Sequence, residues 1–211
     1  MCKYMLHCHA AHIAHSLPHH RHQDDQGSYH FASTVQNLKQ QVPDILVECL
    51  TPDFRADEEC VRRVAVSGLD VFAHNIETVE RLTPSVRDRR AGYAQSWRTL
   101  EMAAAAKPGL FTKTSIMLGL GEKPEEVRAT MQDARNAGVQ IITLGQYLRP
   151  TKRHLPVSEY VHPDQFAEYE RDAQDMGFMY VASGPLVRSS YKAGELFLEG
   201  KLRQRDAEGR A

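Results

Sequence analysis

From Tyr29 onward, short apolar runs alternate along the chain with longer amphipathic segments. The runs are rich in β-branched and aromatic residues, which favour strands, and they lie at 45–49, 69–73, 111–118, 140–145 and 178–182. The amphipathic segments have apolar residues at helical spacing and lie near 33–42, 57–67, 93–106, 124–137 and 163–176. This alternation predicts βαβ units and a parallel sheet, so the expected fold class is α/β, as an open doubly wound sheet or as a barrel.

Two of the expected helices carry clear start and stop signals. Pro124 and Pro163 suit the first helical position, where a missing backbone N–H costs no intrahelical hydrogen bond. Gly138 and Gly177 stand where these helices should end, because glycine readily takes the left-handed conformation of a helix cap. We therefore expect the helix boundaries in the second half of the chain to be sharp.

Polar or glycine-containing stretches follow directly after each expected strand. They are Thr51–Phe54, His74–Asn75, Gly119–Glu122, Gln146–Pro150 and Ser183–Pro185. In parallel α/β folds the carboxyl ends of the strands share one face, and that face carries the active site. The pattern predicts a shared site there, while turn chemistry alone is the alternative for each stretch.

Three of these stretches leave two interpretations open. His74 either orients a ligand or is a hydrogen-bonded core histidine. Gly119 and Gly121 either let the backbone approach a ligand or form a strand-to-helix turn. The carboxylates after them would repel an anion, so a ligand with a cationic or hydroxyl-bearing part fits better. A basic cluster is either a solvated loop or a contact for an acidic partner, and it comprises Arg149, Lys152, Arg153 and His154.

The composition is that of an ordinary globular chain of 211 residues, with 42% hydrophobic and 25% charged residues. A formal net charge of -1 gives no basic excess for binding nucleic acid or an anionic membrane. No apolar run approaches the ~20 residues of a membrane-spanning helix. The four cysteines form no C-x-x-C pair, so we expect reduced, scattered thiols.

Both ends of the chain depart from the regular pattern. Seven of the eleven histidines lie in the first 22 residues, where Pro18 would interrupt a helix. No carboxylate or cysteine stands at firm ligand spacing between these histidines, so a disordered leader over 1–24 is expected rather than a metal site. Residues 201–211 read as a charged tail, which leaves 25–200 as the folded part.

Several strings between residues 25 and 200 are distinctive: HFASTV, LTPDFR, SGLDVFAHNIETV, VRDRRAGYAQS, TKTSIMLGLGE, TLGQYLRPTKRHLPVSEYV and SGPLVRSSYKAGE. In these strings the chain resembles the second half of lipoyl synthases, radical enzymes that use S-adenosylmethionine, and their organellar eukaryotic members most closely. The resemblance implies an incomplete (βα)6 barrel, similar to a TIM barrel, with only its later strands and a C-terminal extension. Ala56 stands where the family usually has glycine, which puts the tight turn after PDFR in doubt.

The resemblance also implies a reaction and its cofactors. Lipoyl synthases are sulfurtransferases of lipoate biosynthesis, and they insert two sulfurs at C6 and C8 of an octanoyl chain on a carrier-domain lysine. They use S-adenosylmethionine and two [4Fe-4S] clusters, one on a C-x3-C-x2-C loop and an auxiliary one on C-x4-C-x5-C. The implied partners are iron–sulfur carrier proteins and the octanoylated glycine cleavage H protein and 2-oxoacid dehydrogenase E2 subunit, with neither nucleic acid nor membrane. The implied compartment is the mitochondrion, or alternatively the plastid, although no targeting peptide is visible.

The family's functional residues carry over onto matching positions of this sequence. Ser190 of the R-S-S-Y motif would be the fourth ligand of the auxiliary cluster, and a weak alkoxide ligand suits a cluster that is consumed. Arg188 would contact substrate or anchor the C-terminal segment. The pocket for S-adenosylmethionine would be lined from three strand ends by Asn75, Ile116, Leu118, Glu122, Gln146 and Leu148.

Neither cysteine motif of the family occurs among the 211 residues. Cys2 and Cys8 have C-x5-C spacing without a third cysteine, and Cys49 and Cys60 lie within the ordinary βα pattern. Because no other group here could reductively cleave S-adenosylmethionine, we expect a truncated, inactive chain with no catalytic residue of its own. The alternative is a non-catalytic derivative that binds the octanoylated carrier domain or a sister subunit. Without its first strands, the barrel would also have a bare parallel edge.

Overall fold

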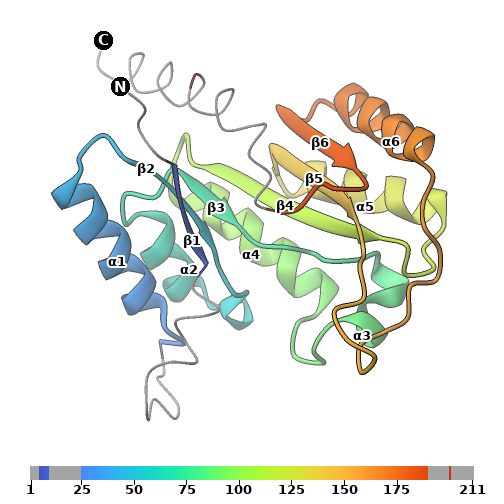
Figure 1. Ribbon diagram of the computed structural model, residues 1–211. Helices are drawn as coiled ribbons and strands as arrows, with labels where there is room; N and C mark the ends of the chain where they lie inside the picture. The colour runs from blue at the N-terminus through green and yellow to red at the C-terminus, as the bar shows by residue number, and fades with distance from the viewer. Residues whose placement is uncertain (1–4, 10–24, 190–199, 201–211) are drawn as a thin grey trace.

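The computed structural model describes residues 5–9 and 25–189 together with Gly200. Within these residues six parallel strands form one sheet in the order β1-β2-β3-β4-β5-β6. The strands are β1 (Met5–His9), β2 (Leu46–Leu50), β3 (Val71–Ala73), β4 (Phe111–Leu118), β5 (Ile141–Gln146) and β6 (Tyr180–Gly184). The strand order follows the chain without the reversal that a doubly wound sheet requires, so the sheet is part of a (βα) barrel (Figure 1).

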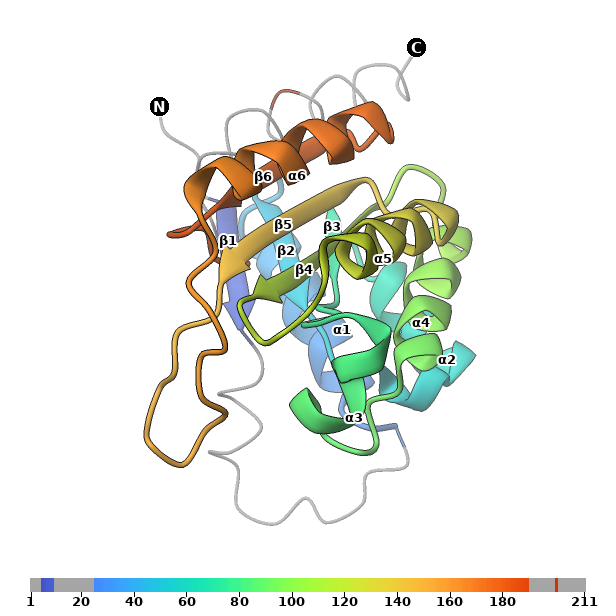
Figure 2. The same ribbon diagram turned by 90° about the vertical axis from the view of Figure 1, so that its right-hand side faces the viewer.

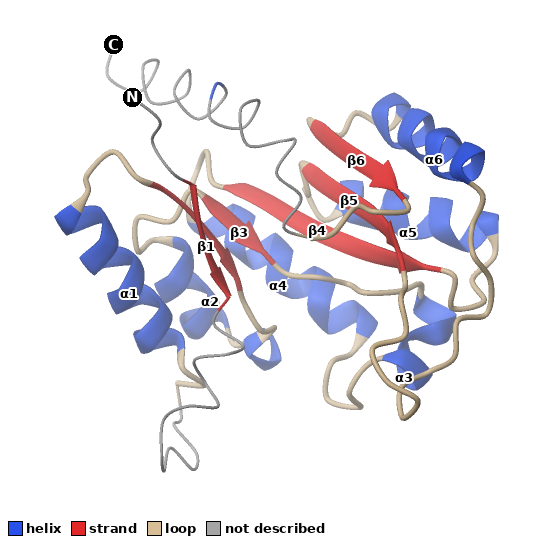
Figure 3. Cartoon of the chain, in the orientation of Figure 1, coloured by secondary structure: helices blue, strands red, loops and turns tan. Residues whose placement is uncertain are grey.

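Helices connect the strands and cover one face of the sheet, as Figures 2 and 3 show. They are α1 (Ser28–Gln41), α2 (Glu58–Ala65), α3 (Thr83–Val86), α4 (Tyr93–Ala106), α5 (Pro124–Asn136) and α6 (Pro163–Asp175), with short 3-10 turns at Phe54–Ala56 and Glu80–Leu82. The helices and strands expected from the sequence after Tyr29 are confirmed, with boundaries shifted by a few residues. Pro124 and Pro163 open α5 and α6, and Gly138 and Gly177 follow them with left-handed φ angles of 77° and 83°.

The N-terminal end differs from the sequence-based prediction. Met5–His9 form β1 in parallel register with β2, with Met5 opposite Leu46 and His9 opposite Leu50. The expected disorder over 1–24 is therefore wrong for these five residues. The free edge of β2 exposes backbone N–H and C=O groups, and an extended segment satisfies them whatever its composition. The other leader residues and the 201–211 tail lie outside the described residues.

The two faces of the sheet differ in what covers them. Alternate strand residues, among them Val47, Phe72 and Leu144, are fully buried against the helices in the main apolar core. The residues between them face the inner side, where Val71 and Ile141 form a small separate apolar cluster. Because side chains alternate along a strand, helix-side and inner-side positions can be assigned for each strand whose side chains are described.

The tight turn after PDFR forms although this chain carries alanine there. The φ angles of Phe54, Arg55 and Ala56 are 46°, 52° and 54°, which is the left-handed region. The Asp53 side chain accepts a hydrogen bond from the Arg55 N–H at 3.0 Å and helps to hold this conformation. A side chain at position 56 therefore strains the turn without preventing it. Among the described helices, none is long and apolar enough to cross a membrane.

Candidate functional site

The chain that leaves β3 runs alongside β4 and brings new residues to the carboxyl face. The Glu77 N–H donates to the Ser115 carbonyl at 3.0 Å, and the Met117 N–H donates to the Glu77 carbonyl at 2.8 Å. Glu77 thereby pairs with Ile116 as an isolated parallel bridge. This pairing carries Asn75 and Glu77 to the same edge of the sheet as the end of β4.

Asn75, Glu77 and Arg87 form a polar group at this edge, which we call the Glu77 cluster. Burial raises the pKa of the Glu77 carboxyl, while the Asn75 amide and the Arg87 charge favour its ionised form. Burial likewise lowers the pKa of the Arg87 guanidinium, and the charges of Glu77 and Asp53 oppose that change. Glu77 also has a φ of 68°, a strained conformation for a residue with a side chain. Strain and partly buried charge at one strand end are common at binding sites.

Glu77 and Arg87 were not identified from the sequence. Both lie inside quoted family strings, but neither stands directly after an apolar run. The signal that was available is a single acidic residue, Glu77, within the otherwise uncharged stretch from His74 to Val79. Its left-handed backbone and its approach to Arg87 depend on how the chain turns after β3, and no local pattern encodes that.

His74 is a hydrogen-bonded core residue. Its Nδ1 lies 2.9 Å from the Thr51 carbonyl oxygen, and its Nε2 lies 2.9 Å from the Ser96 hydroxyl. Burial lowers the pKa of His74 to about 4. The hydrogen bond with the Thr51 carbonyl opposes this change, and the positive charge of Arg87 adds to it. Of the two interpretations of His74, the structure favours the neutral core histidine, which links β3 to α4.

The glycine stretch after β4 is closed by the protein itself. The Glu122 carboxylate accepts hydrogen bonds from the N–H groups of Gly119 at 2.6 Å and Leu120 at 2.9 Å. The Ser158 N–H donates to the Gly119 carbonyl at 2.8 Å. A Cβ at position 119 would lie 2.4 Å from the Glu159 carbonyl oxygen. Gly119 is thus needed where the 147–161 loop crosses this turn, which favours the turn interpretation over direct ligand approach.

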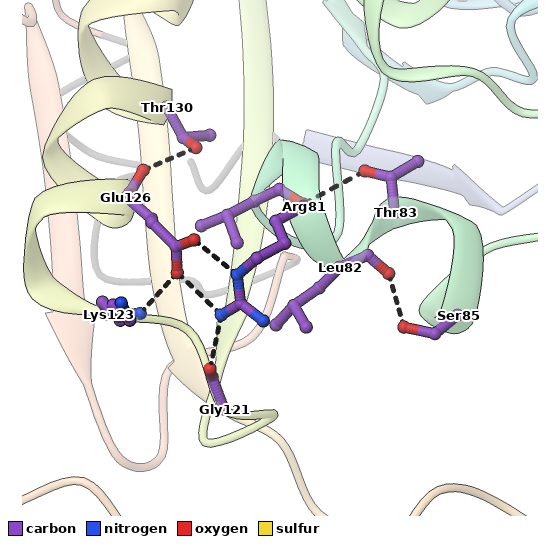
Figure 4. A network of polar contacts seen from close by, with 9 residues as sticks. Arg81, Leu82, Thr83, Ser85, Gly121, Lys123, Glu126 and Thr130 are labelled. Atoms are coloured by element: carbon purple, nitrogen blue, oxygen red, sulfur yellow. Dashed lines mark hydrogen bonds and ion pairs between the residues drawn. The ribbon is translucent and has the colours of Figure 1, made fainter.

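A salt bridge ties the same turn to the segment before α3 (Figure 4). The Arg81 Nε lies 2.6 Å from a Glu126 carboxylate oxygen, and its Nη2 donates to the Gly121 carbonyl at 2.8 Å. Glu126 also accepts from the Lys123 N–H at the start of α5, and the Arg81 contact is the main cause that lowers its pKa to about 2. The acidic residues that would repel an anion here are therefore partly neutralised within the protein.

The remaining residues expected around S-adenosylmethionine lie in different environments. Ile116 and Leu118 are wholly buried on the helix side of β4, so their side chains contact the core. Gln146 donates to the Glu159 carbonyl at 3.1 Å and accepts from the Val161 N–H at 2.9 Å, which commits its amide to the 147–161 loop. Leu148 is half exposed. The structure brings Asn75 and Glu77 beside the end of β4, while the ligand contacts expected of the other residues stay predictions.

The segment after β6 folds back toward the end of β5. The Val187 N–H donates to the Gly184 carbonyl at 3.0 Å, and the Val187 side chain is buried. The Arg188 guanidinium donates to the Val187 carbonyl at 2.7 Å, so it contacts its own segment. Both roles considered for Arg188, contact with substrate and anchoring of the segment, stay predictions. Ser190, the expected cluster ligand, lies outside the described residues.

An iron–sulfur cluster does not fit the part of the chain that the structure describes. No group of three or more His, Cys, Asp or Glu residues within that part could hold a metal ion. Cys49 and Cys60 are buried in the core and form no disulfide, and burial raises the pKa of the Cys60 thiol. The Cys60 thiol donates to the Asp25 carbonyl at 3.4 Å.

Comparison with protein families and with curated proteins identifies the family to which the chain is similar. The model of the radical SAM superfamily matches residues 23–134, just over half of the chain. Proteins curated as mitochondrial lipoyl synthases are similar over most of it. The Aspergillus flavus protein is 59% identical over 187 residues, 89% of this chain and 45% of its own length. The proteins of Phytophthora infestans and Aedes aegypti are 57% and 59% identical over 86% and 87% of this chain.

This likeness confirms the resemblance found in the sequence. The chain spans about half the length of the curated relatives it matches, 48% of the Phytophthora infestans protein for example. Among solved structures, a putative lyase/mutase from Burkholderia cenocepacia superimposes with a TM-score of 0.51 over 96% of this chain and 76% of its own. At 14% identity it bears on the fold alone.

Proposed function

Because the chain belongs to the radical S-adenosylmethionine superfamily, we propose that its function is that of the lipoyl synthases it resembles. The reaction is insertion of two sulfurs at C6 and C8 of a protein-bound octanoyl-lysine. The identity of 59% over 187 residues to curated lipoyl synthases carries this proposal. The names of these relatives also favour the mitochondrion as the compartment, with the plastid as the alternative.

The Glu77 cluster is the proposed contact for S-adenosylmethionine, which the superfamily uses together with a [4Fe-4S] cluster. The ligand is a nucleoside joined to an amino acid, so it presents ribose hydroxyls, an ammonium and a carboxylate. The donor set fits these groups, because the Glu77 carboxylate and Asn75 amide suit hydroxyls or an ammonium and the Arg87 guanidinium suits a carboxylate. Bound there, S-adenosylmethionine would lie beside the end of β4.

A titration tests this contact in the chain as it exists. We expect wild-type protein to bind S-adenosylmethionine in isothermal titration calorimetry, and Glu77→Gln to weaken binding at least tenfold. Glu125→Gln is the matched control, because it makes the same change on the exposed first turn of α5. If wild type and Glu77→Gln bind S-adenosylmethionine with equal affinity, the Glu77 cluster is not the contact for this ligand.

The expected inactivity of these 211 residues on their own is also part of the proposal. Neither family cysteine motif is among them, and the described residues form no metal-binding group. Ser190 would then contribute one ligand of an auxiliary cluster whose cysteines must come from elsewhere. Anaerobic reconstitution with iron and sulfide, followed by an octanoylated carrier peptide, should give no stoichiometric cluster and no lipoyl product. A stoichiometric cluster together with conversion of octanoyl to lipoyl would refute the inactivity, and binding of the carrier without turnover would favour the non-catalytic derivative.

The basic loop after β5 supports a carrier domain as the partner. Arg149 holds this loop by donating to the carbonyls of Lys152 and His154, and the Tyr147 hydroxyl donates to the Leu155 carbonyl at 3.0 Å. Lys152 and Arg153 are exposed and make no ion pair among the described residues. Such a loop favours an acidic protein surface, and the charge reversal Arg153→Glu should weaken binding of an octanoylated H protein. Arg171→Glu on α6 is the control, and equal loss in both variants would argue against the loop.

A further inference from the structure

The backbone of the C-terminal segment rests directly on a glycine of β5. A Cβ built on Gly145 would lie 2.2 Å from the Val187 carbonyl oxygen and 3.1 Å from its carbonyl carbon. Real Cβ atoms do not approach oxygen that closely, and the atom in the way belongs to the backbone, which cannot rotate aside as a side chain can. The absence of a side chain at Gly145 is therefore what allows Val187 to lie there.

Several contacts hold Val187 in this place. Gly145 pairs with Gly184 across the β5–β6 ladder, and the Val187 N–H donates to the Gly184 carbonyl at 3.0 Å. Val187 is 7% exposed, and the Arg188 guanidinium donates a hydrogen bond to the Val187 carbonyl. The chain that leaves β6 thus turns back over β5 and crosses its inner face at Gly145.

We propose that Gly145 is a positioning residue for the segment that carries the R-S-S-Y motif. Because Gly145 has no side chain, the Val187 backbone can lie directly against it, and we call this contact the seat. The seat sets the point from which the residues after Val187 continue. The seat thus places Val187 over β5 immediately before Arg188, the first residue of the R-S-S-Y motif. The consequence for a cluster ligand rests on the proposed function, whereas the seat itself is a property of this chain.

A matched pair of glycine substitutions tests the seat. Gly145→Ala should displace the Val187 backbone, whereas a Cβ on Gly184 would lie 3.4 Å from the flexible Cγ2 of Val187. Neither glycine has a φ in the left-handed region, so alanine is conformationally allowed at both. The two variants thus add the same methyl group on facing residues, one against backbone and one against a side chain.

The measurement is protection of the segment in the intact chain. We expect Gly145→Ala to speed trypsin cleavage after Arg188 and hydrogen exchange of the Val187 N–H at least tenfold, with Gly184→Ala within about twofold of wild type. Exchange within α5 reports the rest of the fold and should stay unchanged in both variants. Wild-type protection of Val187 in Gly145→Ala would overturn the proposal, and so would equal loss of protection in α5.

This test does not depend on the proposed function. Protection of Val187 needs no cluster, no S-adenosylmethionine and no carrier domain. If the seat is confirmed but Glu77→Gln leaves S-adenosylmethionine binding unchanged, the proposed ligand contact fails and the role of Gly145 stands. If Gly145→Ala leaves Val187 protected but Glu77→Gln weakens S-adenosylmethionine binding, the proposed role of Gly145 fails and the proposed ligand contact stands.

Discussion

The helix side and the inner side of this sheet use polar residues differently. On the helix side, polar residues are bonded to nearby backbone, as where the Thr112 hydroxyl donates to the Gly138 carbonyl at 3.2 Å. On the inner side, Lys113 on β4 pairs with Glu48 on β2 at 2.7 Å, with both side chains 6% exposed. Thr143, also on the inner side, is buried with its hydroxyl unpartnered among the described residues.

This difference suggests that helix-side residues stabilise the fold, whereas inner-side polar residues are available for binding or catalysis. Apolar packing against the helices needs no charge, and helix-side hydroxyls such as that of Thr112 are bonded to backbone. The Trp97 Nε1 on α4 is an exception, because it is buried with no partner among the described residues. The inner side instead contains a buried ion pair across β3 and a hydroxyl with no partner among the described residues, and both groups carry a desolvation cost that apolar side chains would not. In a barrel, ligands bind at the carboxyl ends of the strands, where the inner side opens, so polar groups on the inner side are consistent with the proposed site.

Breaking the inner ion pair should have the largest effect. Glu48→Leu would leave the Lys113 ammonium buried without its carboxylate and should destabilise the protein by about 3–5 kcal/mol. Denaturant unfolding measures this change. The double variant Glu48→Leu with Lys113→Met should recover most of the loss, because two apolar side chains replace the pair. A single variant as stable as wild type would mean that the pair carries no stability.

Low pH should weaken the helix side through His74. Its pKa of about 4 in the folded protein lies below the 6.5 of the unfolded chain, so the unfolded chain binds the proton first as pH falls. The stability contributed by neutral His74 is complete above pH 6.5 and is lost as pH falls toward 4, by about 3 kcal/mol in all.

Unfolding curves at pH 7 and pH 4.5 measure this loss, and a His74→Gln variant isolates it. Carboxylates also titrate in this range, but they do so equally in both proteins. We expect the difference in stability between wild type and His74→Gln to shrink on acidification. A constant difference would show that His74 does not titrate across the folding transition.

Removing the unused hydroxyl on the inner side should have a smaller effect of opposite sign. Thr143→Val keeps the side-chain shape and removes a buried group that has no partner among the described residues, so a gain of about 1 kcal/mol is expected. Thr112→Val on the helix side is the control and should destabilise, because its hydroxyl is bonded to Gly138. Destabilisation by both changes would mean that the two sides do not differ in this respect.

The exposed salt bridge in Figure 4 should matter least. Arg81→Ala removes the contacts to Glu126 and to the Gly121 carbonyl, but exposed ion pairs are screened by water and salt. We expect an unchanged denaturation midpoint, with only faster hydrogen exchange in the turn at 119–122. A clear fall in the denaturation midpoint would mean that the Arg81–Glu126 contact contributes to stability as the buried Glu48–Lys113 pair does.

Periodicity in the sequence was enough to predict the elements of the fold. The five apolar runs became β2 to β6, and Pro124, Gly138, Pro163 and Gly177 bound their helices as expected. These signals are local, because strand and helix periods and cap chemistry depend on residues a few positions apart. The polar stretches after the strands lie at the carboxyl edge of the sheet, and the site predicted there stays a prediction. Neither signal predicted β1, which forms where residues 5–9 pair with the edge of β2.

Which polar residues meet was decided only by the tertiary structure. Glu48 and Lys113 are 65 positions apart and pair because β2, β3 and β4 align in one register. Glu77 approaches Arg87 because the chain after β3 pairs with β4, and Gly145 is constrained by Val187, which lies beyond the next strand. The sequence by itself determined the strands and the helices. Which polar residues meet at the carboxyl edge of the sheet was determined by register and chain crossings, because these depend on contacts between segments far apart in the sequence.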